Sequence, residues 1–221
     1  MALLLFQERC TMGVEAPKKL SNGRIAMANI CDQCVVIVAE DDAAMTEVLK
    51  AMCENVLKGI AGESYFRRDE VVAAGDDMDA LYELMRQCND RMNLLCFFAK
   101  EPDCRTESGY MSWMVDHIND HPLISFDIGV KWSASGDPYS FCSTLDKKRY
   151  GFSIVCSGEA YEWECAEADG KYYDAAEFVE EVNKAKASKQ PKTLSAIAHK
   201  RALSSAMTDI YECYINEDWD C

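Results

Sequence analysis

The order of apolar and polar positions along the chain predicts alternating strands and helices. Residues 33–40 contain the β-branched run Val35-Val36-Ile37-Val38, which is typical of a buried strand. Asp41 and Asp42 follow as a helix cap and an acidic first turn, and apolar residues then recur at helical spacing as far as Gly59. A strand that leads into an amphipathic helix is the beginning of a β-α-β unit.

The middle of the chain predicts two further helices and two further strands. A helix is expected at about 76–92, and a strand at 94–98. A second helix is expected at 108–119, ended by Pro122, because four apolar residues would share one of its faces: Tyr110, Trp113, Met114 and Ile118. Residues 123–132 alternate enough to form a half-buried strand.

The last third predicts short strands and then helices. In chain order we expect a short helix ending near Tyr150, strands at 152–156 and 161–165, a turn at Asp169-Gly170, a helix from about 174, a break at 188–192 and a helix at 193–215. This mixture predicts an α+β sandwich with helices on one face of an antiparallel or mixed sheet, plus C-terminal helices. The expected organisation is an extension (1–26), the α+β domain (27–174) and a helical appendage (175–221).

Composition narrows the partners that the chain can take. It has 38 acidic and 23 basic residues among 221, a formal net charge of −15. A chain this acidic is repelled by phosphate backbones and by anionic membranes, so we expect neither direct nucleic-acid binding nor membrane binding. No apolar run approaches the roughly 20 residues that span a bilayer. The charge keeps a protein soluble, and it also favours a basic partner.

The twelve cysteines and the N-terminal segment predict a cytoplasmic protein. The apolar start at residues 1–6 is too short for an export signal and has no basic residues before it. Several cysteines, Cys53, Cys88, Cys96, Cys142 and Cys156, lie within apolar periodic segments. Reduced cysteine packs as a small hydrophobic residue, so we expect most of them to be thiols in the core.

Two stretches carry a family resemblance. Residues 27–33, Met-Ala-Asn-Ile-Cys-Asp-Gln, stand before a valine-rich strand and an acidic helix start, and Gly129-Val130-Lys131-Trp132-Ser133-Ala134 is a second stretch. Together they resemble the YubB ferredoxin-like domain family over about residues 27–174. Ile30 stands where that family has tryptophan, and Gln33 where it usually has asparagine. The resemblance implies a ferredoxin-like α+β fold, frequent on mobile elements, and it implies no activity.

Two short motifs have only some of the features of a redox, zinc-binding or nucleophile motif. Cys31-Asp32-Gln33-Cys34 is a CxxC, but it precedes a strand, whereas a redox dithiol follows one at a helix start, and a zinc site would need a second pair. Ser133-Ala134-Ser135-Gly136-Asp137 lacks the frame of a nucleophile loop and is expected to be a turn before a helix. The chain has no Walker loop and no dinucleotide-binding glycine pattern, and we expect no cofactor.

The histidines suggest an alternative metal site. His117 and His121 stand four residues apart and would share one face of the predicted helix, with Asp120 and Asp116 as further ligands. A zinc peptidase would have glutamate where Ile118 stands. Histidine near a helix end is also favourable for the helix dipole alone, so a purely structural role stays open.

Carboxylates gather in two late segments. Five of them, Glu159, Glu162, Glu164, Glu167 and Asp169, are expected to be the solvent face of the late strands. The segment 216–221 contains Glu217, Asp218, Trp219 and Asp220, and an aromatic residue among acids can either dock on a partner or fold back on the body of the protein.

These observations leave several functions open. The leading hypothesis is a non-enzymatic binding module, encoded on a mobile element, that acts through protein–protein contacts. Its variant is an acidic mimic of nucleic acid that inhibits a DNA-binding protein. The alternatives are a metal-dependent enzyme that uses His117 and His121, and a domain that assembles only with itself as a homo-oligomer.

Overall fold

The computed structural model describes residues 30–58, 66–87, 94–100, 108–131, 135–157, 166–173, 175–189 and 191–205. Its elements follow one another in the order β1 (Ile30–Ala39), α2 (Asp42–Lys58), α3 (Arg68–Ala74), α4 (Met78–Arg86), η1 (Leu94–Phe97), β2 (Ser108–Ile118), β3 (His121–Lys131), α5 (Asp137–Cys142), β4 (Tyr150–Ser157), β5 (Ala166–Ala168), β6 (Lys171–Tyr173), α6 (Ala175–Ala187) and α7 (Leu194–Ser205).

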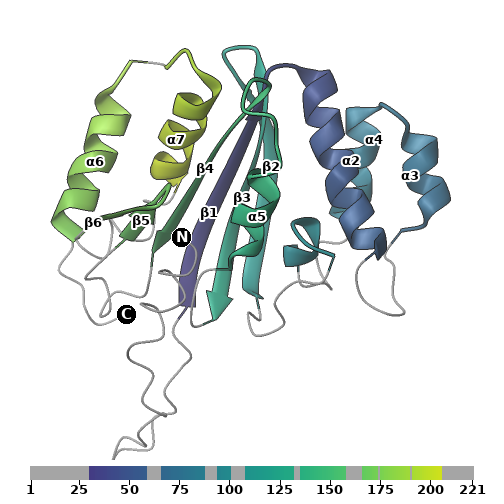
Figure 1. Ribbon diagram of the computed structural model, residues 1–221, viewed down its shortest axis with the longest axis horizontal. Helices are drawn as coiled ribbons and strands as arrows, with labels where there is room; N and C mark the ends of the chain where they lie inside the picture. Colours follow the sequence, from purple (N-terminus) through teal and green to yellow (C-terminus); the bar gives the residue numbers. More distant parts are fainter. Residues whose placement is uncertain are drawn as a thin grey trace, which may run out of the picture.

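The strands form one sheet of six in the order β2-β3-β1-β4-β5-β6. Each neighbouring pair is antiparallel. β1 lies between β3 and β4, although both of these strands come much later in the sequence than β1 (Figure 1). β2 is an edge strand of the sheet. The α+β class and the antiparallel sheet predicted from the sequence are therefore confirmed.

β1 explains why the sheet has helices on both faces. Val35, Ile37 and Ala39 belong to one core cluster, while Cys34, Val36 and Val38 belong to a second. Successive side chains of a strand point to opposite faces, so an uninterrupted apolar strand needs an apolar cover on each. All six side chains are buried.

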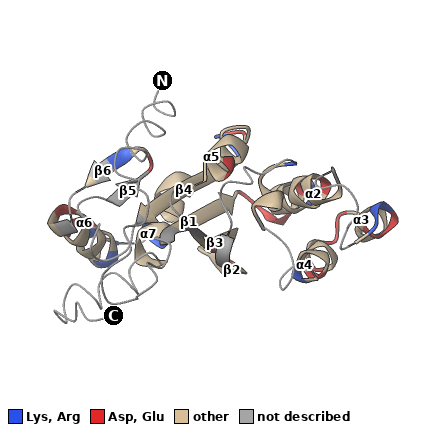
Figure 2. Ribbon diagram, turned by 90° about the horizontal axis from the view of Figure 1, so that it is seen from below, with Lys and Arg blue, Asp and Glu red and all other residues tan. Residues whose placement is uncertain are grey.

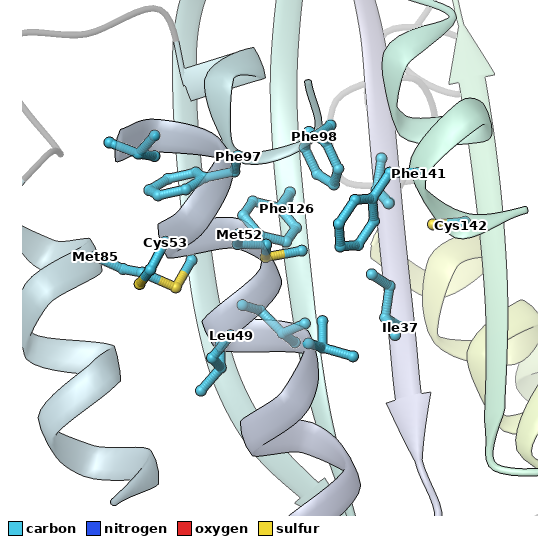
Figure 3. Packing of buried hydrophobic residues seen from close by; sticks show 14 of the residues in the cluster. Ile37, Leu49, Met52, Cys53, Met85, Phe97, Phe98, Phe126, Phe141 and Cys142 are labelled. Atoms are coloured by element: carbon cyan, nitrogen blue, oxygen red, sulfur yellow. The ribbon is translucent and has the colours of Figure 1, made fainter. Parts of the chain in front are cut away.

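The first face carries α2, α4, η1 and α5. Leu49 and Met52 of α2 point toward the sheet, and four phenylalanines fill the space between η1, β3 and α5: Phe97, Phe98, Phe126 and Phe141 (Figure 3). The rings of Phe98 and Phe126 meet edge to face with centroids 4.9 Å apart, an arrangement that aromatic quadrupoles favour.

The second face carries the two C-terminal helices. Ile197, Ala198, Ala202 and Leu203 of α7 share a buried cluster with β1, and α6 adds Phe178 and Val182 (Figure 1). The sequence predicted helices on one face plus C-terminal helices of unspecified position, and in the structure these C-terminal helices cover the second face. In Figure 2 the strands are largely tan, and charged residues lie mainly on helices and turns.

Residues 108–119, predicted as a helix, instead form strand β2 and the first residue of the turn that follows it. Trp113 and Val115 pack toward the first face, whereas Met114 is exposed on the second, which is a period of two. Asn119 and Asp120 have φ of 53° and 65°, as a two-residue type I′ hairpin turn requires. The same apolar residues also fit a helical period, and only this turn decides between the two.

Two further elements differ from expectation. Leu94–Phe97 is a single 3-10 turn and not a strand, although the side chains of Leu95, Cys96 and Phe97 are buried as a strand's would be. α3 was not predicted, and it begins at a capping box in which Glu70 accepts from the backbone of Arg67. The predicted strand 161–165 and the predicted helix beyond Ser205 lie outside the described residues.

Most of the remaining elements are confirmed with shifts of a few residues, whereas the short strands β5 and β6 on either side of the predicted turn were not expected. Asp41 caps α2 by accepting a hydrogen bond from the backbone of Ala44 at 2.8 Å. The turn between β5 and β6 is Asp169-Gly170, with φ of 52° and 83°, again a type I′ pair. The short helix before β4 ends at Cys142, and Tyr150 begins β4 itself.

Gly151 of β4 controls how closely α7 approaches the sheet. A Cβ atom at this position would overlap the backbone of Leu194 and Ser195 at the start of α7. We expect Gly151→Ala to lower the free energy of unfolding by about 3 kcal/mol, because the helix must shift away from the sheet. Urea unfolding followed by circular dichroism measures the change.

Gly136 is the matched control. A Cβ atom there meets nothing within 4 Å, and its φ of −77° suits alanine. Gly136→Ala should change the stability by less than about 1 kcal/mol. Equal losses from the two substitutions would contradict the close approach of α7.

Candidate functional site

Four exposed carboxylates form what we call the acidic end of the sheet: Glu40, Asp41, Asp42 and Asp120. Three of them stand where β1 passes into α2, and the fourth lies in the β2–β3 turn. The turn is held against this junction by two histidines. His117 Nε2 lies 3.2 Å from Asp42 Oδ1, and His121 Nδ1 lies 3.0 Å from the carbonyl oxygen of Glu40.

Arg149 neutralises only part of this end. Its Nε donates to Glu40 Oε1 at 2.6 Å, and its Nη1 donates to Glu47 Oε2 at 2.7 Å. The hydrogen bond from Arg149 lowers the pKa of Glu47. Asp41, Asp42 and Asp120 make no ion pair with lysine or arginine among the described residues, so negative charge stays uncompensated here.

Tyr150, at the start of β4, holds the first turns of α2 next to the acidic end. Its hydroxyl donates to the carbonyl oxygen of Ala44 at 3.1 Å and lies 3.1 Å from Glu47. Burial, followed by the hydrogen bond with Glu47, raises the pKa of Tyr150 to about 12. The neutral hydroxyl therefore ties α2 to the start of β4 throughout the physiological range.

The predicted metal site loses the geometry on which it depended. His117 pairs with Pro122 across the hairpin, and His121 pairs with Ile118, so the two histidines lie on opposite faces of it. Asp120 is exposed at the tip of the turn. Within the described ranges, no group of three His, Cys, Asp or Glu residues is placed to hold a metal ion.

The structure brings together three polar residues that spacing did not connect. Asp169 Oδ2 accepts hydrogen bonds from Ser153 Oγ at 2.9 Å and from His199 Nδ1 at 2.8 Å, and its Oδ1 accepts from the backbone of Ile154 at 2.9 Å. The cluster joins β4, the β5–β6 turn and α7. Because the turn holds Asp169 at positive φ, its carboxylate points back over β4.

This cluster has the residue types of a hydrolytic triad but not its geometry. In a triad the serine contacts the histidine nitrogen opposite to the one that meets the carboxylate. Here Ser153 and Nδ1 of His199 meet the same carboxylate oxygen, and Ser153 is 0% exposed. A serine without access to solvent cannot attack a substrate, so the cluster is a polar tie between α7 and the sheet.

The cysteines that the structure describes act as packing residues. Cys34, the second cysteine of the CxxC, is buried, and burial raises its thiol pKa far above the ordinary value. Burial likewise raises the pKa of Cys142 to about 12. A thiolate is the reactive form of cysteine, so neither residue suits nucleophilic or redox chemistry.

The loop at 133–137 behaves as the turn that was expected where it is described. Ser135 is buried, its hydroxyl accepts from the backbone of Asp137 at 3.2 Å, and its carbonyl oxygen accepts from Gln33 Nε2 at 2.9 Å. The side chain of Gln33 thus joins β1 to the start of α5.

Several predicted positions lie outside the described residues. These are the partner-binding segment with Glu217, Asp218, Trp219 and Asp220, the carboxylates Glu159, Glu162 and Glu164, and the tryptophans Trp132 and Trp163. The side chains of Cys31 and Glu167 also lie outside. The tail therefore stays a predicted binding segment.

Sequence reasoning missed His199, Ser153 and Arg149. No signal in the sequence joins 153, 169 and 199, because their contact depends on α7 folding back over β4. The turn at Asp169-Gly170 was the one available clue, since Asp at a type I′ turn is often placed to bond nearby backbone.

Comparisons with protein-family models, with curated proteins and with solved structures give no match. Among the described helices, none combines the length and the apolar character that a membrane span requires.

The His199–Asp169 pair predicts a pH-dependent stability. The hydrogen bond with Asp169 raises the pKa of His199 above its ordinary value of 6.5. A raised pKa in the folded state means that the stabilisation is complete below about pH 6.5 and is lost as the pH rises through the folded-state pKa. We expect this part of the pH dependence to vanish in His199→Gln.

Urea unfolding at half-unit steps between pH 5.5 and 8.5 measures this dependence. Asp169→Asn should flatten the curve in the same window, because it removes the carboxylate that holds the proton. A wild-type curve that runs parallel to the curve of His199→Gln would show that the pair contributes nothing.

Proposed function

We propose that this chain is a non-enzymatic binding module that contacts a basic protein through the acidic end of its sheet. The observation that supports this proposal most directly is the convergence of Asp41, Asp42 and Asp120 from two segments about 80 residues apart, without a lysine or arginine partner among the described residues. Exposed charge of one sign speeds association with a partner of the opposite sign and selects against others.

The carboxylates of the acidic end are carried by well-fixed backbone, which favours a role in binding over a role in solubility alone. The β2–β3 turn is a tight two-residue type, and Asp41 is fixed as a helix cap. The contacts of His117 and His121 hold the turn against the β1–α2 junction. Charges on a rigid frame lose little conformational entropy when a partner binds.

We also propose that the core is a ferredoxin-like domain related to the YubB family. The element order β1-α2-β2-β3-α5-β4 supports this, because it contains the β-α-β-β-α-β succession of that fold. α3, α4 and the β5–β6 hairpin extend it. Three buried cysteines that are free thiols, Cys34, Cys96 and Cys142, support action in a reducing compartment such as the cytoplasm.

Neutralising the acidic end tests the proposal. In Asp41→Asn/Asp42→Asn/Asp120→Asn, asparagine still caps a helix and still tolerates positive φ, so the fold should be kept while the local charge is lost. We expect basic proteins retained from native lysate by the tagged wild type to be lost by this variant, and purified partner to bind at least about tenfold more weakly.

The control makes the same chemical change elsewhere. Asp69→Asn/Asp76→Asn/Asp79→Asn alters the net charge equally on and around α3 and α4, and it should leave binding intact. Binding of a basic partner should also weaken as salt rises. Equal losses in the two variants would indicate a general charge effect, and unchanged binding in the first variant would reject the acidic end as the site.

A further inference from the structure

Strand β2 presents a long free edge. It has 11 residues, and none of the strands in the described residues pairs with its outer side. Natural edge strands are usually protected by charges, proline or bulges. β2 has no charged residue and no proline from Ser108 to Val115, and its one irregularity lies between Ser108 and Tyr110, at the strand's start.

An exposed apolar side chain stands at the middle of this edge. Met114 is 42% exposed, and it is one of two large hydrophobic residues of this exposure among the described residues, the other being Val72 on α3. Met114 points to the second face, where α7 covers β1 and β4 more fully than β2. Ser112 and Asp116 lie beside it on the same face, and both are exposed.

Arg201 of α7 reaches this position, where its contact is with a weak acceptor. Its Nη2 lies 3.3 Å from the sulfur of Met114, which is a weak acceptor. Its Nε is buried and has no hydrogen-bond partner. A guanidinium carries five N–H donors, so the terminal nitrogens of Arg201 beside Met114 can take a stronger acceptor than a thioether.

From these observations we infer that a second copy of this chain pairs with β2, so that two sheets join across a two-fold axis at Met114. In this antiparallel register Met114 faces its own counterpart, Trp113 faces Val115 of the second copy, and Ser112 faces Asp116 of the second copy. Nine residues, Tyr110–Ile118, then pair with the same nine. The inference is independent of the proposed function and uses none of the acidic end's four carboxylates.

This register is selected by its side-chain neighbours. It buries the two methionines against each other and places no like charges directly opposite, which would be destabilising. It also brings Asp116 of the second copy diagonally past Met114, within reach of a long side chain. The guanidinium of Arg201 thereby gains a carboxylate, and two-fold symmetry makes this contact twice.

Net charge gives the dimer a signature that separates it from binding of a basic partner. Two copies of formal charge −15 repel each other, and salt screens this repulsion. Self-association through β2 should therefore strengthen between about 50 and 500 mM salt, whereas binding of a basic partner weakens.

Sedimentation equilibrium of the full chain in reducing buffer tests the inference. We expect a dimer whose dissociation constant rises at least about tenfold in Met114→Lys, which places like charges on the axis. Val72→Lys removes the other exposed hydrophobic residue, and it should leave the dimer unchanged. Circular dichroism confirms that both variants fold.

A charge exchange tests the contact itself. Arg201→Glu and Asp116→Arg should each weaken the dimer, and the double variant should recover most of the loss, because each new pair forms across the axis. A wild type that is monomeric at 100 μM would overturn the inference, as would a dimer unaffected by Met114→Lys. Alternate β2 amides bond to β3, and the others face outward. If the outward-facing amides of the monomer are protected from hydrogen exchange, another segment of this chain covers the edge, which also overturns the inference.

Discussion

The burial of β1 on both faces is the constraint on which the rest of the structure depends. Every side chain from Cys34 to Ala39 is buried, so a single layer of helices could not satisfy this strand. The helices between β1 and β2 cover one face, and the chain must supply a second cover from α6 and α7. The C-terminal helices are therefore required by the first strand of the described structure.

The helices α6 and α7 cover less of the second face than the full width of the sheet, and this leaves part of β2 exposed. α7 lies over β1 and β4, and Gly151 lets it approach the backbone there. The Asp169 cluster then fixes the helix by polar contacts on the β4 side. On the opposite side Arg201 extends toward β2, where the helical cover ends and Met114 is exposed. The position of α7 over β4 and β1 thus explains both its polar contacts with the Asp169 cluster and the exposure of Met114 on β2.

The elements that could be predicted from sequence are those whose pattern has one interpretation. The β-branched run of β1 and the capped, periodic start of α2 are such patterns, and so is the Asp169-Gly170 turn. β2 was mistaken for a helix because Trp113, Met114 and Ile118 fit a helical stripe as well as a strand. The decisive residues were Asn119 and Asp120, whose positive φ makes a hairpin. Short apolar runs carry this ambiguity whenever the turn signal is weak.

The prediction of a helix in place of β2 also produced the predicted metal site at His117 and His121. Two histidines four residues apart share a face on a helix, but across a two-residue hairpin they point to opposite faces. In place of a shared metal ion, His117 contacts Asp42 and His121 contacts the backbone of Glu40. These contacts join residues about 80 positions apart, so no local sequence pattern encodes them.

The acidic end and the β2 edge place opposite demands on the same net charge. A charge of −15 favours a basic partner at the acidic end, and it opposes the approach of a second copy at β2. Pairing through β2 therefore has to gain enough from backbone hydrogen bonds, from burial of Met114 and from the contact of Arg201 with Asp116 of the second copy to exceed this repulsion. A basic partner bound to each copy would lower the repulsion, so occupancy of the acidic end and pairing of the edges would reinforce each other. Linkage makes that coupling reciprocal, since any partner that promotes pairing must also bind the paired form more tightly.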